Sequence, residues 1–231
     1  MVDDCSKDDS VNIIKKLMEI DHRILLFQNK ENRGTLYTKS KGILNSKGKY
    51  IMTLDEDDMY TQNDVFSTIY EEAEKDDLDI LGFASLETGL KFSKRLIIHR
   101  YLNTPVLYPP DISKRMYTYQ RNGKVKRVGD VLWNYIFRTE LFQKTIEKID
   151  KNVFKIKMNC YDDFLIFFSI TRNARKLKQI PRIFYLKIKW KKKNNTKIIF
   201  RLNEKKNKDN LNCMELANYI RYLKTFYGFF N

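Results

Sequence analysis

The sequence predicts an α/β fold in which helices cover a mainly parallel sheet, and three observations support this class. Short apolar runs alternate with helical stretches up to about residue 83, in the order β-α-β-α-β. The 231 residues are 42% hydrophobic and 13% aromatic, which is enough for a substantial core. The apolar run Tyr50 to Leu54 leads directly into the acidic run Asp55 to Asp58, as when a buried strand ends at a ligand site.

Each element of the first part of the chain has its own signal. Ser6 can cap a helix with Asp9 three positions later, and the apolar face of this helix would consist of Val11, Ile14, Leu17 and Met18. Strands are expected at residues 23–27, 50–54 and 78–83, and helices at 35–45 and from Asn63 or Asp64 to about Lys75.

The second part of the chain is less regular. Residues 84–129 lack clear periodicity and contain three of the four prolines, so a variable connection is expected there. Regular pattern returns in the strand 131–137, the helix 139–149, a helix marked by Tyr161, Phe164, Leu165 and Phe168, the strand 182–189 and the amphipathic helix 211–226. We expect one main domain over residues 1–190, followed by a basic connector and helix over 191–231.

The charge is unevenly distributed. The net charge of +15 divides into −8 for residues 1–90 and +23 for residues 91–231, counted from the sequence. The basic part could face phosphates, anionic lipid or an acidic acceptor. Lysine, asparagine, isoleucine and tyrosine are all frequent, as A/T-rich codons would produce, so the alternative is a charge without any ligand.

Cysteine usage and hydropathy indicate the cellular compartment of the protein. Cys5, Cys160 and Cys213 are odd in number and far apart, which favours reduced thiols over disulfides or a zinc site. No apolar stretch is long enough to cross a bilayer, and the aspartates of the first ten residues exclude a signal peptide. These features predict a cytoplasmic protein, and the basic, aromatic segment from Lys187 to Phe230 could rest on an anionic membrane surface.

The acidic run has a specific chemistry. Adjacent carboxylates repel, so a chain that lines them up after a strand is expected to place a cation between them. Asp55 and Asp57 point the same way, and Asp58 begins the turn beyond them. Oxygen ligands without histidine or cysteine suit Mg²⁺ or Mn²⁺ that bridges to a phosphate. The alternative is a solvated acidic loop that caps the next helix.

Two further acidic pairs could carry chemistry. Asp162 and Asp163 begin the aromatic-rich helix, where one of them could act as a general base or both could simply complement the helix dipole. Asp3 and Asp4 could accept hydrogen bonds from a nucleoside, or belong to a plain helix-entry loop.

The order of these motifs is similar to that of the family 2 glycosyltransferases of the GT-A fold. The matching elements are Val2-Asp3-Asp4-Cys5-Ser6, Asn32-Arg33-Gly34, the stretch from Gly42 to Ile51, Leu54-Asp55-Glu56-Asp57-Asp58, the stretch from Leu132 to Arg138, and Tyr161-Asp162-Asp163-Phe164-Leu165. The resemblance covers residues 2 to about 190 and is most specific from 2 to 70. It implies a GT-A, Rossmann-like sheet flanked by helices.

The resemblance also implies roles for individual residues. Asp3, Asp4, Lys39 and Asp55 would contact the nucleotide-sugar, with Lys39 at a position where the family usually has arginine. Asp55 and Asp57 would form the D-x-D motif that binds the metal, with Asp57 the direct ligand. Asp163 would be the base. Trp133 could stack on the acceptor sugar, or could be a buried core tryptophan.

The implied function is metal-dependent transfer of a sugar, with inversion, from a nucleotide-sugar to an acceptor hydroxyl. The donor would be a UDP-sugar, the cofactor Mn²⁺ or Mg²⁺, and the acceptor a glycan, lipid or protein. A calcium loop is excluded because Tyr60 stands where glycine is needed. A nucleotidyltransferase would show a glycine-rich phosphate loop, and the eight glycines are scattered.

The sequence departs from the family pattern in ways that keep two other readings open. The chain starts inside the first matching element, so the family's first strand is missing and the sheet is expected to be N-terminally incomplete. Cys5, Ser40 and Asp162 replace the usual glycine, asparagine and glutamate. The chain would then be a piece of a longer enzyme or an inactive GT-A-like scaffold. The other alternative is a basic nucleic-acid-binding protein, although no nucleic-acid partner is expected for a transferase.

Overall fold

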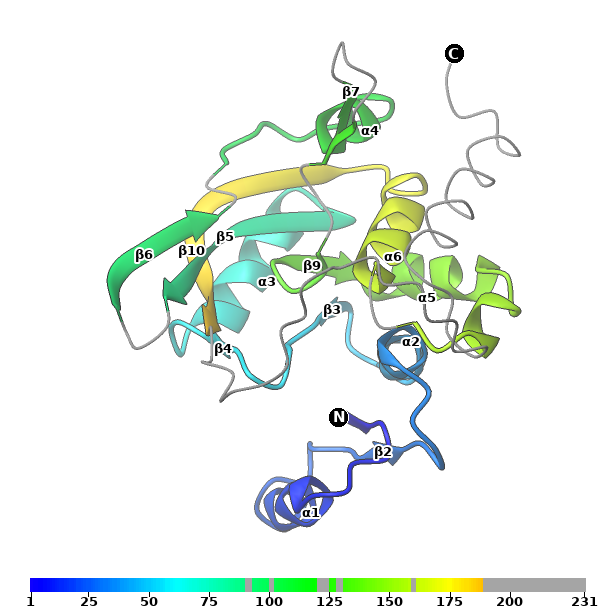
Figure 1. Ribbon diagram of the computed structural model, residues 1–231. Coiled ribbons are helices and arrows are strands. Elements are labelled where there is room, and N and C mark those ends of the chain that lie inside the picture. Colours follow the sequence, from blue (N-terminus) through cyan, green and yellow to red (C-terminus); the bar gives the residue numbers. More distant parts are fainter. Residues whose placement is uncertain (90–92, 100–101, 120–124, 128–130, 159–160, 189–231) are drawn as a thin grey trace. The chain divides into compact units, whose positions relative to one another are not determined.

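The computed structural model describes residues 1–89, 93–99, 102–119, 125–127, 131–158 and 161–188 (Figure 1). Two compact units share these residues. The first unit comprises residues 1–45 and 149–162, and the second comprises residues 46–148 and 163–188. The expected helix 211–226 and most of the basic segment from Lys187 to Phe230 lie outside the described residues.

The first unit contains a small parallel sheet and two helices. Strands β1 (Val2–Asp3) and β2 (Phe27–Gln28) pair in parallel. Helix α1 (Ser10–Ile20) connects them, and α2 (Thr35–Leu44) and the short 3₁₀ helix η1 (Val153–Lys155) complete the unit. The bounds of α2 confirm the helix expected at 35–45.

A glycine is required where the chain enters α2. Gly34 has a φ of 84°, in the left-handed region that favours glycine. A Cβ added there would lie 2.9 Å from the carbonyl oxygen of Met158, closer than real Cβ contacts allow. Both the backbone conformation and this close approach therefore exclude a side chain at the start of α2.

Two elements of the first unit begin later than expected, the helix by three residues and the strand by four. The Ser6 backbone N–H donates to the Asp3 carboxylate, so this segment forms a turn and α1 starts at Ser10. The strand expected from residue 23 begins at Phe27, because the Ile24 N–H donates to the Asp21 carbonyl in another turn. Helix α1 has the expected apolar positions but buries none of its residues.

The second unit is built on a larger sheet, which among the described residues has the strand order β3-β9-β5-β10-β4, with β6 paired to β5. Its strands are β3 (Tyr50–Met52), β4 (Met59–Tyr60), β5 (Ile80–Gly89), β6 (Ser93–His99), β9 (Tyr135–Arg138) and β10 (Leu177–Ile188). Strands β5 and β10 run in parallel, as Figure 1 shows. Strand β9 lies antiparallel between β3 and β5, so the sheet is mixed rather than mainly parallel.

Helices cover both faces of this sheet because side chains alternate along β9. Ile136 belongs to a core cluster with Val65, Ile69 and Ala73 of α3 (Val65–Lys75). Tyr135 and Phe137 point the other way and pack against Phe142 of α5 (Thr139–Lys148) and Phe167 of α6 (Asp162–Thr171). The expected helices starting near Asp64, Thr139 and Asp162 are thereby confirmed.

The connection expected at residues 84–129 contains more regular structure than its pattern indicated. Strand β5 continues to Gly89 and forms a hairpin with β6, followed by α4 (Asp111–Met116), β7 (Tyr117–Tyr119) and β8 (Val125–Arg127). Strand β10 starts at Leu177, five residues before the expected strand. A register shift between Ile180 and Ile183 accommodates Pro181.

The expected strand 131–137 is shorter, because the Tyr135 N–H donates to the Leu132 carbonyl in a turn before β9. Within the described part of the chain, no helix is both long and apolar enough to cross a membrane.

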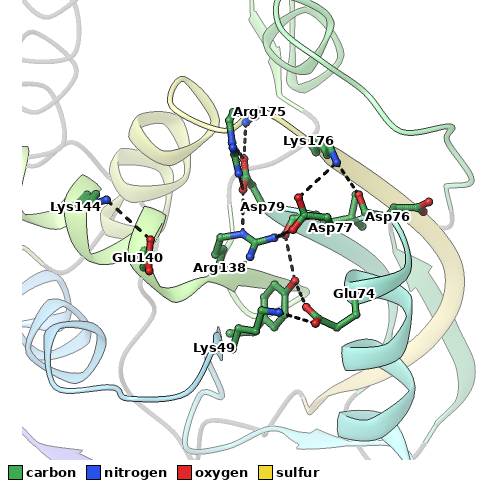
Figure 2. A network of polar contacts seen from close by, with 12 residues as sticks. Lys49, Glu74, Asp76, Asp77, Asp79, Arg138, Glu140, Lys144, Arg175 and Lys176 are labelled. Carbon is green, nitrogen blue, oxygen red and sulfur yellow. Dashed lines mark hydrogen bonds and ion pairs between the residues drawn. The ribbon is translucent and has the colours of Figure 1, made fainter.

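An ion-pair network joins several strands of the second unit (Figure 2). Asp79, which is 3% exposed, accepts hydrogen bonds from Arg138 Nε at 3.1 Å and from the Arg175 backbone N–H at 2.7 Å. Arg138 also contacts Asp77 at 2.6 Å. Nearby, Tyr50 donates to Glu74 at 2.8 Å. These contacts therefore connect the start of β3, the end of β9 and the residues just before β10 with the segment that leads into β5.

We expect Asp79→Asn to lower the free energy of unfolding by about 2–4 kcal/mol, because it removes the buried one of the two carboxylates that the half-buried Arg138 guanidinium contacts. Urea unfolding followed by circular dichroism measures this loss. Glu140→Gln is the matched control, since its pair with Lys144 is long, at 4.0 Å, and exposed. Equal effects of the two substitutions would show that burial of Asp79 does not matter.

The same carboxylate is expected to make stability depend on pH. Burial alone would raise the pKa of Asp79, but hydrogen bonds and charge from Arg175, together with Arg138, lower it below 3.8. The folded protein then binds this proton less readily than the unfolded chain. The stabilisation is present above the unfolded-state pKa and is lost as the pH falls through the lower folded-state pKa. On acidification from about pH 5 to about pH 3, the urea midpoint of the wild type should fall more than that of Asp79→Asn.

Candidate functional site

The acidic run forms the connection between β3 and β4. The Asp58 N–H donates to the Asp55 carbonyl at 3.2 Å, which closes a turn, and β4 then pairs antiparallel with β10. We call residues Asp55 to Asp58 the acidic turn. Within it, Asp57 is exposed and Asp55 and Asp58 are half-buried. The two carboxylates of the predicted metal motif thus follow a strand end, as the sequence indicated.

A tyrosine of β10 holds the acidic turn. The Tyr185 hydroxyl donates to Asp58 Oδ2 at 2.8 Å and accepts from the Asp55 backbone N–H at 3.3 Å. Burial, followed by the hydrogen bond to Asp58, raises the pKa of Tyr185. The hydroxyl therefore keeps its proton and acts as a donor to the carboxylate.

Burial also raises the pKa of Tyr60 to about 12, with a smaller contribution from the negative charge of Asp55. This neighbouring tyrosine therefore stays protonated as well. Its hydroxyl donates to the Thr53 carbonyl at 3.4 Å, so it contacts the chain just before the acidic turn.

Trp133 lies against this tyrosine. Its ring stacks on that of Tyr185, with centroids 4.7 Å apart and an interplanar angle of 25°. The Nζ atom of Lys187 lies over the ring of Trp133, 5.0 Å from the ring centroid. Only 6% of Trp133 is exposed, so the residue predicted to contact the acceptor belongs to the core cluster of the second unit.

Asp163, the predicted base, contacts the turn before β9 that contains Trp133. Asp163, in the first turn of α6, accepts a hydrogen bond from the Leu132 N–H at 3.3 Å. Asp163, Trp133 and the acidic turn are thus connected within the second unit, through Leu132 at one end and Tyr185 at the other. The structure brings these predicted residues together through contacts that the sequence did not indicate.

Asp4 organises a loop of the first unit. Its carboxylate accepts hydrogen bonds from Asn29 Nδ2 at 2.9 Å and from the backbone N–H groups of Arg33 and Gly34, both at 2.8 Å. Burial would raise the pKa of Asp4, but these hydrogen bonds outweigh it and lower the pKa. Asp4 is therefore ionised and fixes the loop that precedes α2.

Asp3 and Lys39, which are also predicted to contact the nucleotide-sugar, belong to the first unit, whereas Asp55 belongs to the second. Asp3 is 6% exposed and its carboxylate accepts the Ser6 N–H at 3.3 Å. Lys39, on α2, forms an ion pair with Asp162 at 3.1 Å. Asp162 therefore pairs with the lysine that is predicted to contact the nucleotide-sugar. The two residues are far apart in the sequence, which gives no signal of their pairing.

The donor chemistry of the acidic turn fits a hard divalent cation. Among the residues that the structure describes, no three histidine, cysteine, aspartate or glutamate side chains gather closely enough to hold an ion alone. Mg²⁺ and Mn²⁺ sites commonly use only one or two carboxylates, with substrate phosphates and water as the remaining ligands. Asp55 and Asp57 provide that number, and Asp57 is exposed.

Comparison with curated proteins finds bacterial glycosyltransferases. The chain is 25% identical over 187 residues to the uncharacterized glycosyltransferase EpsJ of Bacillus subtilis, which covers 80% of this chain and 51% of that protein. It is also 25% identical over 187 residues to the cholesterol galactosyltransferase of Borreliella burgdorferi, with 80% and 50% covered. The chain spans about half the length of these relatives.

Solved structures show the same fold. Residues 1–349 of TarS from S. aureus, solved with UDP-GlcNAc, match with a TM-score of 0.59 and 14% identity, over 84% of this chain and 49% of that chain. GalNAc-T7, solved with UDP, GalNAc and Mn²⁺, matches with a TM-score of 0.55 and 15% identity, over 96% and 41%. The fold is thus that of the GT-A glycosyltransferases, which confirms the fold class expected from the sequence.

A family model gives the same assignment from the sequence side. The model described as glycosyl transferase family 2 matches residues 1–144, which is more than half of the 231 residues. The chain therefore belongs to glycosyl transferase family 2.

Proposed function

We propose that this chain is a metal-dependent glycosyltransferase domain that moves a sugar from a UDP-sugar to an acceptor hydroxyl with inversion. The observation that carries the proposal is the connection of Asp163 to the acidic turn through Trp133 and Tyr185. It links a carboxylate suited to proton transfer with carboxylates suited to a divalent cation. Among the similar structures, TarS was solved with UDP-GlcNAc, which supports a donor of this class.

The acidic turn would hold the metal through Asp55 and Asp57. Mn²⁺ or Mg²⁺ bound there would neutralise the charge that develops on the departing diphosphate. Glu56 is exposed and is not part of the D-x-D pair. The mixture of exposed and fixed carboxylates suits a site whose remaining ligands come from the donor's phosphates.

Asp163 would act as the base. Its carboxylate takes the proton of the acceptor hydroxyl, while the acceptor oxygen forms a bond to the anomeric carbon and the bond from that carbon to the diphosphate breaks. Attack from the face opposite the leaving group inverts the anomeric centre. The hydrogen bond from the Leu132 N–H to Oδ2 fixes one oxygen of this carboxylate.

We assign Asp3, Asp4 and Lys39 to recognition of the nucleotide. A carboxylate has about four acceptor positions, and the contacts with Asn29, Arg33 and Gly34 use three of those of Asp4. Thr38 also contributes a hydrogen bond to this carboxylate, so a ribose hydroxyl or a uracil imide would have to replace one of these partners. Lys39 would have to share its charge between Asp162 and a phosphate. Trp133 would support the acceptor sugar only through its small exposed part.

We expect Asp57→Ala to reduce Mn²⁺-dependent release of UDP from a panel of UDP-sugars by at least about 100-fold, since one direct metal ligand is lost. Glu56→Ala is the matched control, because it removes the same charge from the neighbouring exposed position and should keep its turnover. Equal activity of the two variants would contradict the metal assignment. Absence of turnover in the wild type with every donor and with either metal would favour an inactive scaffold.

We expect Asp163→Asn to lower kcat by about 10²–10⁴-fold while the Kd for UDP stays unchanged, since the amide cannot accept the acceptor's proton. The asparagine oxygen can still accept from the Leu132 N–H, so the fold should be kept. Steady-state kinetics and calorimetric titration with UDP measure the two quantities. A change in Kd with unchanged kcat would move Asp163 from the base to the donor site.

A further inference from the structure

Tyr185 contacts the acidic turn at both of its ends. Its hydroxyl donates to the carboxylate of Asp58 at 2.8 Å and accepts from the backbone N–H of Asp55 at 3.3 Å. Donor and acceptor capacity of one hydroxyl are thus both used on the same turn. Asp57, the proposed metal ligand, lies between the two contacted residues in the sequence.

The position of this hydroxyl is fixed by the core of the second unit. Tyr185 is fully buried, and its ring stacks on Trp133 at 4.7 Å and meets the edge of Tyr60 at 5.8 Å. Tyr185 and Tyr60 are also partners in the register of β10 and β4. A ring packed on two sides and carried by a paired strand cannot swing away, so its hydroxyl is a rigid anchor.

A rigid anchor is needed because repulsion between its carboxylates destabilises the acidic turn. Four carboxylates in successive residues repel one another, and without a fixed point the turn would spread. The hydroxyl provides Asp58 with a neutral donor and does not compete with a cation for the site. It also ties down the backbone of Asp55, and with it the direction in which the following residues present their oxygens.

We propose that Tyr185 is a positioning residue of the metal site, which sets the geometry of the acidic turn so that Asp55 and Asp57 can bind the cation together. The inference rests on the proposed function, because it presupposes that this turn binds the metal. The stacked Trp133 contributes by holding the ring of Tyr185, and the neighbouring Leu132 contacts Asp163. One aromatic pair would thereby hold the metal ligands and the base in a fixed relation.

The test is direct measurement of Mn²⁺ binding in the presence of UDP, from the electron paramagnetic resonance signal of free Mn²⁺. We expect Tyr185→Phe to raise the Kd for Mn²⁺ about tenfold, which corresponds to the loss of a hydrogen bond to a charged group. The ring and its stacking are kept, so the thermal midpoint should change by only a few degrees. The KM for Mn²⁺ should rise more than kcat falls.

Tyr135→Phe is the matched control. Tyr135 is as fully buried as Tyr185, and its hydroxyl accepts a hydrogen bond from Gln179 at 3.2 Å instead of contacting the acidic turn. We expect this variant to lose stability but to bind Mn²⁺ as the wild type does. If both tyrosine variants weakened Mn²⁺ binding equally, Tyr185 would have a general structural role only, and the positioning proposal would be overturned.

Asp57→Ala separates failure of this proposal from failure of the proposed function. If Asp57→Ala abolishes Mn²⁺ binding while Tyr185→Phe binds with unchanged Kd, the metal site stands and the positioning role of Tyr185 is wrong. If Asp57→Ala binds Mn²⁺ like the wild type, the acidic turn is not the metal site, and both proposals fail. Both proposals are supported if Tyr185→Phe binds Mn²⁺ about tenfold more weakly than the wild type and Asp57→Ala does not bind it.

Discussion

The repulsion within the acidic turn is the constraint on which the candidate site depends. Four carboxylates in sequence are unfavourable in any compact arrangement unless hydrogen bonds or a cation offset their charge. Part of this stabilisation comes from β10, a strand that follows the acidic turn by more than a hundred residues in the sequence. Its pairing with β4 holds the far side of the turn, and the Tyr185 hydroxyl holds Asp55 and Asp58. Both contacts come from β10, so the acidic turn is held only when β10 is paired within the second unit.

The elements that the sequence predicted well are those whose signals are local. Helix α2 ends just before Asn45, near the expected Gly48, α3 begins directly after Asp64, and α6 begins at Asp162. The elements that began late were displaced by side chains that compete for backbone hydrogen bonds. Asp3 captures the Ser6 N–H, and the Asp21 segment forms a turn that delays β2. Which acceptor binds a given backbone N–H depends on the three-dimensional structure, so hydrophobic periodicity does not predict it.

The same distinction applies to the site. Asp55 and Asp57 could be selected from the sequence because they follow a predicted strand, whereas Asp163 was selected by its match to the motif of the similar family. Tyr185 could not, since it stands in the apolar run of β10 and reads as one more core residue. Its role follows from the stack with Trp133 and the reach of its hydroxyl, both long-range contacts. The pairing of Lys39 with Asp162 was hidden for the same reason.

The carboxylate pair at the start of α6 shows how neighbouring residues can take different tasks. Successive residues on a helix point about 100° apart, so Asp162 and Asp163 face different surroundings. Asp162 is buried, and its carboxylate forms an ion pair with the ammonium of Lys39. Asp163 is half-buried, and its carboxylate accepts a hydrogen bond from the backbone N–H of Leu132. The ion pair with Lys39 therefore distinguishes Asp162 from its neighbour, and our proposal of Asp163 as the base agrees with the position of the family's motif.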